Sequence, residues 1–155
     1  MSPKLAKQIR VELDVLHRLL ERHPGLLEKC GREVPTALEI DALANMLHSF
    51  YTGIENIFKR IQVTVDELTD DTGFSHAALL DIMARPSEKR PAVISPELRT
   101  VLRNYLQFRH MFRHAYSFEL KWSRMSHLVL GMRDALQRLA RELTMFLDQT
   151  SKTSK

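Results

Sequence analysis

Residues 36–61 read TALEIDALANMLHSFYTGIENIFKRI and carry apolar side chains at helical spacing. At the start of this segment, Thr36 and Glu39 match a capping box, in which each side chain accepts a hydrogen bond from the other residue's backbone N–H. The apolar residues fall on one stripe of a helix, and they are Leu43, Leu47, Phe50, Ile54, Ile57 and Ile61. This pattern predicts a long helix that buries one face in a core.

Helix-start and helix-stop signals flank this segment on both sides. A serine and a proline at positions 2 and 3 predict a helix that runs to about His23, where the sequence His-Pro-Gly ends it and a short connecting segment follows. Ser75 predicts the start of a short helix that reaches Ala84, and Ser95 predicts the start of another. Residues 64–73 are acidic and are expected to form a loop or a ragged helical turn, while residues 85–91 form the clearest loop.

The chain after Pro96 contains no further proline and a single glycine, Gly131. One helix from there to Gln149 would be about 80 Å long at 1.5 Å per residue, too long for a compact domain of this size. The apolar phase resets around Trp122, so we expect a break between Tyr116 and Arg124. A final helix is then expected to end at Gln149.

These segments predict an all-α fold, an antiparallel up-and-down bundle of four main helices plus a short helix. With 155 residues, we expect a single domain over residues 1–149 and a disordered tail over residues 150–155. The one cysteine, Cys30, cannot form an internal disulfide. The sequence also lacks a secretory signal and a bilayer-length apolar run, so the expected location is the cytoplasm.

Composition excludes several classes of chemistry. The sequence contains no glycine-rich phosphate loop, no Cys/His cluster at zinc spacing and no Glu-x-x-His pair of a di-iron bundle, so we expect no metal. The net charge is +4, and residues 99–117 hold four arginines, two histidines and no acid. A basic segment of this kind attracts nucleic acids, acidic proteins or membranes, although on composition alone it is more often a solvated helix face.

One constellation in this basic segment has a specific spacing. Residues 109–116 read RHMFRHAY, which gives the pattern R-x-x-x-x-H-x-Y with Arg109, His114 and Tyr116. Arg18 and His23 repeat the arginine–histidine spacing, but a proline and a glycine follow and no tyrosine lies two places on. The extended motif is therefore more informative than the bare pair.

The sequence resembles the HepT-like toxins of the HEPN superfamily (higher-eukaryote and prokaryote nucleotide-binding). The resemblance rests on FYTGIENIFKR (residues 50–60), SHAALL (75–80), RPAVI (90–94) and FRHMFRHAY (108–116). It covers most of the chain from about Leu38 to Tyr116 and, more loosely, the last expected helix. It implies a HEPN-like fold and a metal-independent endoribonuclease toxin of a type VII-like toxin–antitoxin system, which cleaves tRNA or mRNA. It further implies a nucleotidyltransferase antitoxin of the MNT type as the partner.

The resemblance also assigns roles to individual residues. It implies that Arg109 and His114 are catalytic, since imidazole titrates near neutral pH and guanidinium can grip phosphate oxygens. Supporting residues would be His110, Glu55 and Arg113. Tyr116 would be adenylylated by the antitoxin with ATP, while cleavage itself would need no cofactor.

Ideal helix geometry separates the two catalytic residues. At about 100° per residue, Arg109 and His114 lie about 140° apart, with His110 and His114 on one strip and Arg109, Arg113 and Tyr116 on another. One copy then supplies a single motif histidine. A symmetric pair of copies would provide both acid and base across one cleft, so we expect a homodimer with the active centre at its interface.

Simpler interpretations exist for each residue. Arg109 could hold the bundle together by pairing with Glu55, His114 could be a solvated histidine, His76 a residue that merely starts a helix, and Tyr116 a bundle aromatic. The chain as a whole could accordingly be a non-catalytic HEPN-type module that binds nucleotide or protein, or a purely structural helical adaptor.

Overall fold

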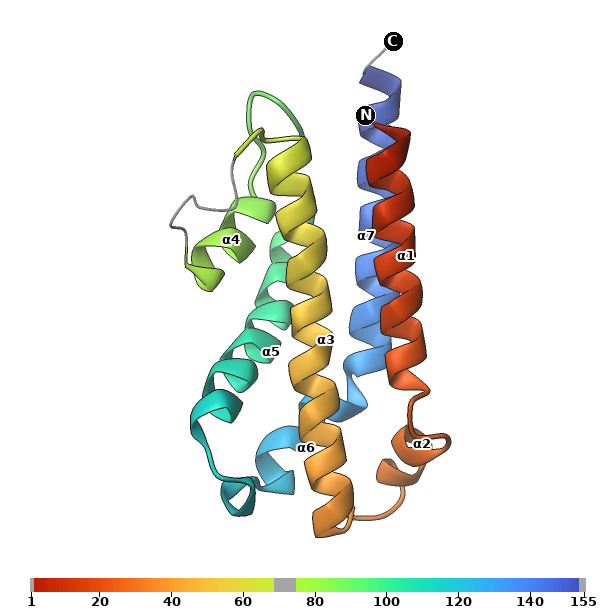
Figure 1. The fold of residues 1–155 in the computed structure, drawn as a ribbon, viewed down its shortest axis with the longest axis vertical. Coiled ribbons are helices and arrows are strands. Elements are labelled where there is room, and N and C mark those ends of the chain that lie inside the picture. The colour runs from red at the N-terminus through yellow and green to blue at the C-terminus, as the bar shows by residue number, and fades with distance from the viewer. Residues whose placement is uncertain (1, 69–74, 154–155) are drawn as a thin grey trace.

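The computed structural model describes residues 2–68 and 75–153, and helices dominate this part of the chain (Figure 1). Its elements are α1 (Pro3–Leu20), α2 (Leu26–Cys30), α3 (Ala37–Thr64), α4 (His76–Met83), α5 (Pro96–His114), the 3-10 turn η1 (Ser117–Glu119), α6 (Trp122–Leu130) and α7 (Met132–Thr153). No strand forms within the described ranges, where Ser87 and Arg90 make an isolated bridge. The all-α prediction is confirmed.

Four long helices form the bundle and alternate in direction. Figure 1 shows α1 and α5 running down and α3 and α7 running up, so that both ends of the chain lie at the same end of the bundle. Helix α3 packs against α1 and α5, and α7 packs against the same two helices, which closes a four-helix ring. The short α4 packs on α3 and α5, outside the ring.

The predicted apolar stripes form the core of this bundle. All six stripe residues of α3 have no exposed surface. The apolar residues at helical spacing in the last segment are also buried, and they are Met125, Leu128, Met132, Leu136, Leu139, Leu143 and Phe146. The capping box is present, with the Glu39 N–H donating to Thr36 Oγ1 over 3.2 Å and the Thr36 N–H donating to Glu39 Oε1 over 3.0 Å. The serine caps at positions 2, 75 and 95 also form.

Three details of the first and last helices differ from the sequence prediction. Helix α1 ends at Leu20 rather than near His23, and the segment expected to be a plain connection contains α2. Helix α7 also continues to Thr153, into the segment for which a disordered tail is predicted. Residues 154–155, like residues 69–74 of the acidic segment, lie outside the described part.

The break before Arg124 is confirmed, but the last segment is divided again at Gly131. The Tyr105 hydroxyl donates to the Leu128 carbonyl over 2.7 Å, and an uninterrupted helix would pair that carbonyl with the N–H of Met132. A Cβ at Gly131 would lie 3.0 Å from the His127 carbonyl oxygen. The lone glycine therefore permits a tight junction between α6 and α7, which the prediction of one continuous helix missed.

A buried ion pair fixes the loop that follows α4. The Arg90 guanidinium donates to both carboxylate oxygens of Asp66, over 2.7 and 3.1 Å, and also to the carbonyls of Ile82, Arg85 and Pro91. Two parallel N–H bonds to one carboxylate give this pair a defined geometry. It ties the far end of α4 to the end of α3 and so holds α4 against the bundle.

None of the described helices is both long and apolar enough to cross a membrane.

Replacement of the N-cap of α3 tests the capping box. We expect Thr36→Ala to lower the free energy of unfolding by about 1 kcal/mol and Tm by about 2–4 °C, because the Glu39 N–H loses its acceptor. The matched control is Thr144→Ala, since the Thr144 hydroxyl donates to the Ala140 carbonyl inside α7 and caps nothing. Equal shifts in Tm for the two variants would contradict the capping argument.

Candidate functional site

The centre of the site is an arginine that α5 places inside the protein. Arg109 is 1% exposed and Glu55, from α3, is 4% exposed. Arg109 Nη2 donates to Glu55 Oε2 over 2.9 Å, and Nη1 donates to the Thr52 hydroxyl, 3.3 Å away. The guanidinium carbon also lies 4.8 Å from the centre of the Tyr51 ring, within cation–π range. The expected pairing of Arg109 with Glu55 therefore forms, and it joins α3 to α5.

Glu55 accepts from more than one cationic group. His76 Nδ1, at the start of α4, lies 2.8 Å from Glu55 Oε2, and the Lys59 ammonium lies 3.6 Å from Oε1. Burial by itself raises the pKa of Glu55, but attraction to Arg109 and hydrogen bonds from His76 and Arg109 outweigh it and hold that pKa below its ordinary value. The carboxylate is accordingly ionised at neutral pH.

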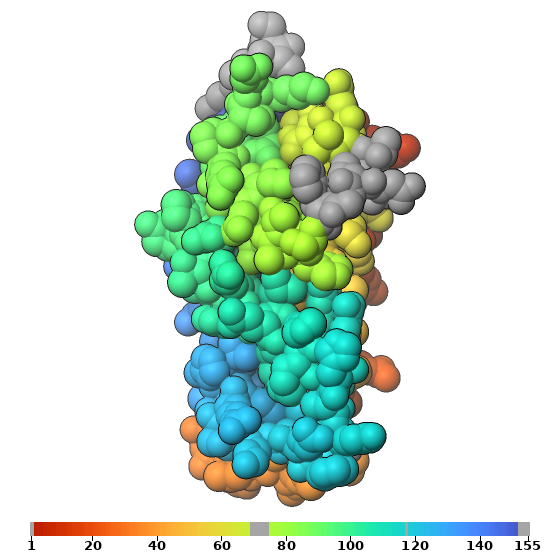
Figure 2. Space-filling view, turned by 90° about the vertical axis from the view of Figure 1, so that its left-hand side faces the viewer, coloured from red at the N-terminus to blue at the C-terminus, as the bar shows by residue number. Residues whose placement is uncertain are grey.

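A pocket of about 320 Å³ opens beside Arg109 and His76. Its lining comes from the start of α4 and from α5, the face that Figure 2 turns toward the viewer. The polar residues that line it are Ser75, His76, Arg103, Gln107, Arg109, His110 and Arg113. No acidic side chain is among these residues, so a polyanion would meet a surface of one sign.

The structure brings only part of the predicted motif to this pocket. His110 lines it, and the His110 and His114 rings lie 5.1 Å apart, so the predicted shared strip of these two histidines is confirmed. His114 is exposed and is not among the lining residues. Tyr116 was expected on the Arg109 strip, and this is wrong because α5 ends at His114 and Ala115 is extended.

Tyr116 instead lies on the surface after α5. Its side chain is 70% exposed and stacks on Phe118, which is 82% exposed, with the ring centres 5.5 Å apart. The interpretation of Tyr116 as a bundle aromatic is therefore wrong.

Arg113 is steadied from the α3 side. Its Nε lies 3.5 Å from His48 Nε2, and the His48 ring packs against Phe112 at 5.5 Å. Burial, followed by the charges of Arg113 and Arg109, lowers the pKa of His48. A neutral His48 can accept a hydrogen bond from Arg113 without adding a charge of its own. The positive charge of Arg113 is therefore not offset by this contact.

His76 is the residue that sequence reasoning missed. It does begin a helix, as expected, but it also lies 3.3 Å from Arg109 Nη2 and lines the pocket. Its neighbours in space are 21 and 33 positions away in sequence, so local spacing could not reveal them. The available signal was a histidine directly after the N-cap Ser75, inside one of the segments that carry the family resemblance.

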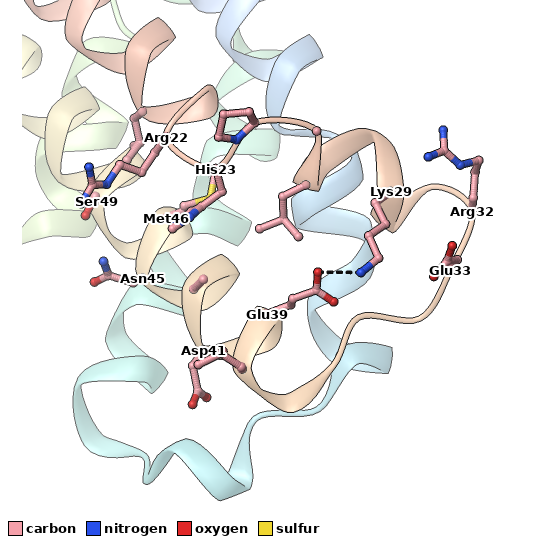
Figure 3. Close-up of a pocket in the computed structure, with 16 residues that line it drawn as sticks. Arg22, His23, Lys29, Arg32, Glu33, Glu39, Asp41, Asn45, Met46 and Ser49 are labelled. Atoms are coloured by element: carbon pink, nitrogen blue, oxygen red, sulfur yellow. Dashed lines mark hydrogen bonds and ion pairs between the residues drawn. The ribbon is translucent and has the colours of Figure 1, made fainter.

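A larger pocket, of about 1220 Å³, lies between the end of α1, α2 and the start of α3 (Figure 3). Figure 3 shows Lys29 reaching from α2 to Glu39 on α3, where the ion pair measures 2.9 Å. Its charged residues carry both signs, and they are Arg22, Lys29, Arg32, Glu33, Glu39 and Asp41. Because these charges largely offset one another and none belongs to the predicted site, the smaller basic pocket is the better candidate for a site that binds phosphate.

Metal ligation and thiol chemistry have little support in the described ranges. No group of three or more His, Cys, Asp or Glu side chains there could hold a metal ion. Cys30 is buried, and burial raises the pKa of its thiol, which agrees with an unreactive cysteine.

Comparison with known proteins identifies the family. The model of the HepT-like protein family matches residues 42–150, which include most of α3, all of α4, α5 and α6, and most of α7. The chain therefore belongs to the HepT-like family, a group of HEPN-type helical modules. No curated protein and no solved structure matches the chain.

The ionised state of Glu55 generates a prediction about acid stability. Because its folded pKa lies below the ordinary value of 4.5, Glu55 stabilises the fold above pH 4.5, and this contribution is lost as the pH falls through the folded pKa. We expect Glu55→Gln to be less stable than the unaltered protein at neutral pH, since Arg109 loses its counter-charge. Its stability should then fall less steeply below pH 4.5.

Urea unfolding between neutral pH and about pH 3 measures both effects. The control is Glu67→Gln, which removes an exposed carboxylate that pairs with Lys89. Parallel stability curves for the Glu55→Gln variant and the unaltered protein would contradict the assignment of an ionised, buried Glu55.

Proposed function

We propose that this chain is a metal-independent endoribonuclease toxin of a type VII-like toxin–antitoxin system. The observation that carries the proposal is the basic pocket on α4 and α5 of a HepT-like protein, in which the motif residue Arg109 lies next to His110. The substrate is RNA, either tRNA or mRNA. The three arginines of the pocket supply the positive charge that a phosphodiester requires.

Because Arg109 is buried and the other two arginines are exposed, we assign them different roles toward the substrate. Arg109 is already bonded to Glu55 and Thr52, so it contributes a fixed charge from inside the protein. Arg103 and Arg113 are exposed and can move to grip the phosphate oxygens of the substrate. A cation held in place before the substrate arrives stabilises the charge that develops on phosphorus without reorganising.

Cleavage then follows the chemistry of the RNA itself. The 2′-oxygen attacks the adjacent phosphorus, the bond to the 5′-oxygen breaks, and a 2′,3′-cyclic phosphate remains. A base removes the 2′-proton and an acid supplies a proton to the leaving 5′-oxygen. We assign His114 to one of these transfers, with the His110 ring in edge-to-face contact beside it.

The proposed assembly is a homodimer. His114 lies outside the pocket of its own chain, one helical turn beyond His110. Two α5 ends that face each other across a twofold axis would bring His114 of one copy toward the basic pocket of the other, and such isologous contacts are the commonest in proteins.

Incubation of the purified protein with RNA in EDTA tests the activity. We expect products with 2′,3′-cyclic ends, and a fall in rate of about 100-fold or more for His114→Ala because one proton transfer loses its catalyst. His127→Ala is the matched control, a histidine on α6 outside the pocket. RNA that is bound but left intact by the unaltered protein would favour the non-catalytic binding module.

Arg109 needs a separate variant, because its removal leaves a buried carboxylate unpaired. The double variant with Arg109→Met and Glu55→Gln removes both charges together and keeps similar volumes. It should remain folded by circular dichroism and lose cleavage. Retained cleavage by this folded double variant would exclude Arg109 from the reaction.

We also propose Tyr116 as the site of AMP attachment by a nucleotidyltransferase antitoxin, in which the tyrosine oxygen attacks the α-phosphate of ATP and pyrophosphate leaves. Its high exposure gives an enzyme access to the hydroxyl, and an added phosphate would sit close in sequence to Arg113 and compete with RNA for positive charge. We expect a mass increase of one AMP when the chain is incubated with such an enzyme and ATP. Tyr116→Phe should block it, whereas Tyr51→Phe, at a buried tyrosine, should not. Modification of the Tyr116→Phe variant would contradict this assignment.

A further inference from the structure

His76 carries the one imidazole in the described ranges that is bonded to a buried carboxylate. Its Nδ1 lies 2.8 Å from Glu55 Oε2, and Glu55 is itself fixed by Arg109. The His76 side chain is nevertheless 51% exposed and lines the basic pocket. This histidine therefore has one edge anchored in the core and the other edge at the pocket.

The anchoring determines which nitrogen is available for chemistry. An ionised carboxylate can only accept hydrogen bonds, so His76 Nδ1 must carry a proton and donate it to Glu55. Arg109 Nη2 lies 3.3 Å from the same Nδ1, but two donors cannot bond to each other, and both point to the shared carboxylate oxygen. In the neutral ring the lone pair is then on Nε2, which makes no hydrogen bond within the described part of the chain.

The other two histidines near the pocket lack this arrangement. His110 and His114 contact each other through their rings, and neither pairs with an acid among the described residues. A carboxylate behind an imidazole sets its tautomer and stabilises the imidazolium that forms on proton uptake. Of the three rings, that of His76 is thus the best prepared to act as a base.

We propose that His76 is a catalytic residue and that Glu55 is its positioning residue. Nε2 takes the proton from the attacking 2′-hydroxyl of the RNA, the new bond forms between that oxygen and phosphorus, and His114 returns a proton to the leaving 5′-oxygen. The imidazolium of His76 then releases its proton to water, and His114 takes up a proton from water, which restores both rings. This assignment rests on the ribonuclease activity proposed above, and it supplies from α4 the second imidazole that the R-x-x-x-x-H-x-Y motif lacks.

The decisive variant is His76→Asn. The asparagine amide can still donate to Glu55, so the buried charges stay paired, but no group replaces Nε2. We expect the rate of RNA cleavage to fall about 100-fold or more, with Tm and RNA affinity close to those of the unaltered protein. The pH–rate profile should lose the limb that reports the base. His17→Asn is the control, an exposed histidine on α1 whose Nδ1 bonds to the Leu13 carbonyl.

Chemical rescue separates catalysis from structure. In His76→Ala, added imidazole should restore part of the lost activity, because free imidazole can take the 2′-proton when it enters the vacated space. A merely structural His76 would give a lower Tm, no rescue and an unchanged pH profile, and that result would overturn the proposal.

The outcomes also distinguish this proposal from the one on which it rests. If the unaltered protein cleaves RNA and His114→Ala does not, while His76→Asn cleaves like the His17→Asn control, the His76 assignment is wrong and the proposed ribonuclease stands. If the unaltered protein cleaves no RNA, both proposals are wrong.

Discussion

The ion pair between Arg109 and Glu55 is the constraint on which the site depends. Both groups are almost fully buried, and two unpaired charges at such depth would each cost several kcal/mol, so each requires the other in place. The pair joins the middle of α3 to the last turns of α5, and the bond from Glu55 to His76 extends it to α4. One carboxylate therefore sets the relative positions of three helices, and the basic pocket lies between two of them. Hydrophobic packing alone, which is not directional, would leave this register less sharply defined.

The pocket gains a specific electrostatic character from the same arrangement. Glu55 offsets much of the charge of Arg109, whereas Arg103 and Arg113 are exposed and have no acidic partner in the described part of the chain. Their field is screened by salt over about 8–10 Å, so it acts on a phosphate that has entered the pocket more than on a distant one. The proposed binding of RNA should accordingly weaken with ionic strength, while the buried pair, which is shielded from solvent, should respond much less. In the proposed ribonuclease, binding and positioning are thus assigned to different arginines.

More of the fold than of the candidate site could be predicted from the sequence. Caps such as Thr36 with Glu39, and stripes such as Leu43 to Ile61, act within one helix, so their spacing carries the information. The division at Gly131 was missed because its cause, the Tyr105 hydroxyl on the Leu128 carbonyl, comes from another helix. The position of His76 at the site was missed for the same reason, because tertiary packing brings its partners Glu55 and Arg109 to it. The pairing of Arg109 with Glu55 was predicted as a way to hold the bundle together, and the bond between the two side chains forms.

The structural and the catalytic interpretations of Arg109 are compatible. A cation that stabilises a transition state works best when it is already oriented, and burial against Glu55 and Thr52 with Tyr51 behind it provides that orientation. The cost is that Arg109 cannot reach far toward a substrate, so other groups must make the first contact and carry out the proton transfers. Exposed arginines on α5 and an imidazole on α4 line the pocket, and the proposed mechanism assigns these steps to them. His76, the first residue of α4, is bonded to Glu55 through Nδ1, and its side chain lines the basic pocket. A purely supporting role for α4 would require the bond to Glu55 but not the placement of the ring at the pocket.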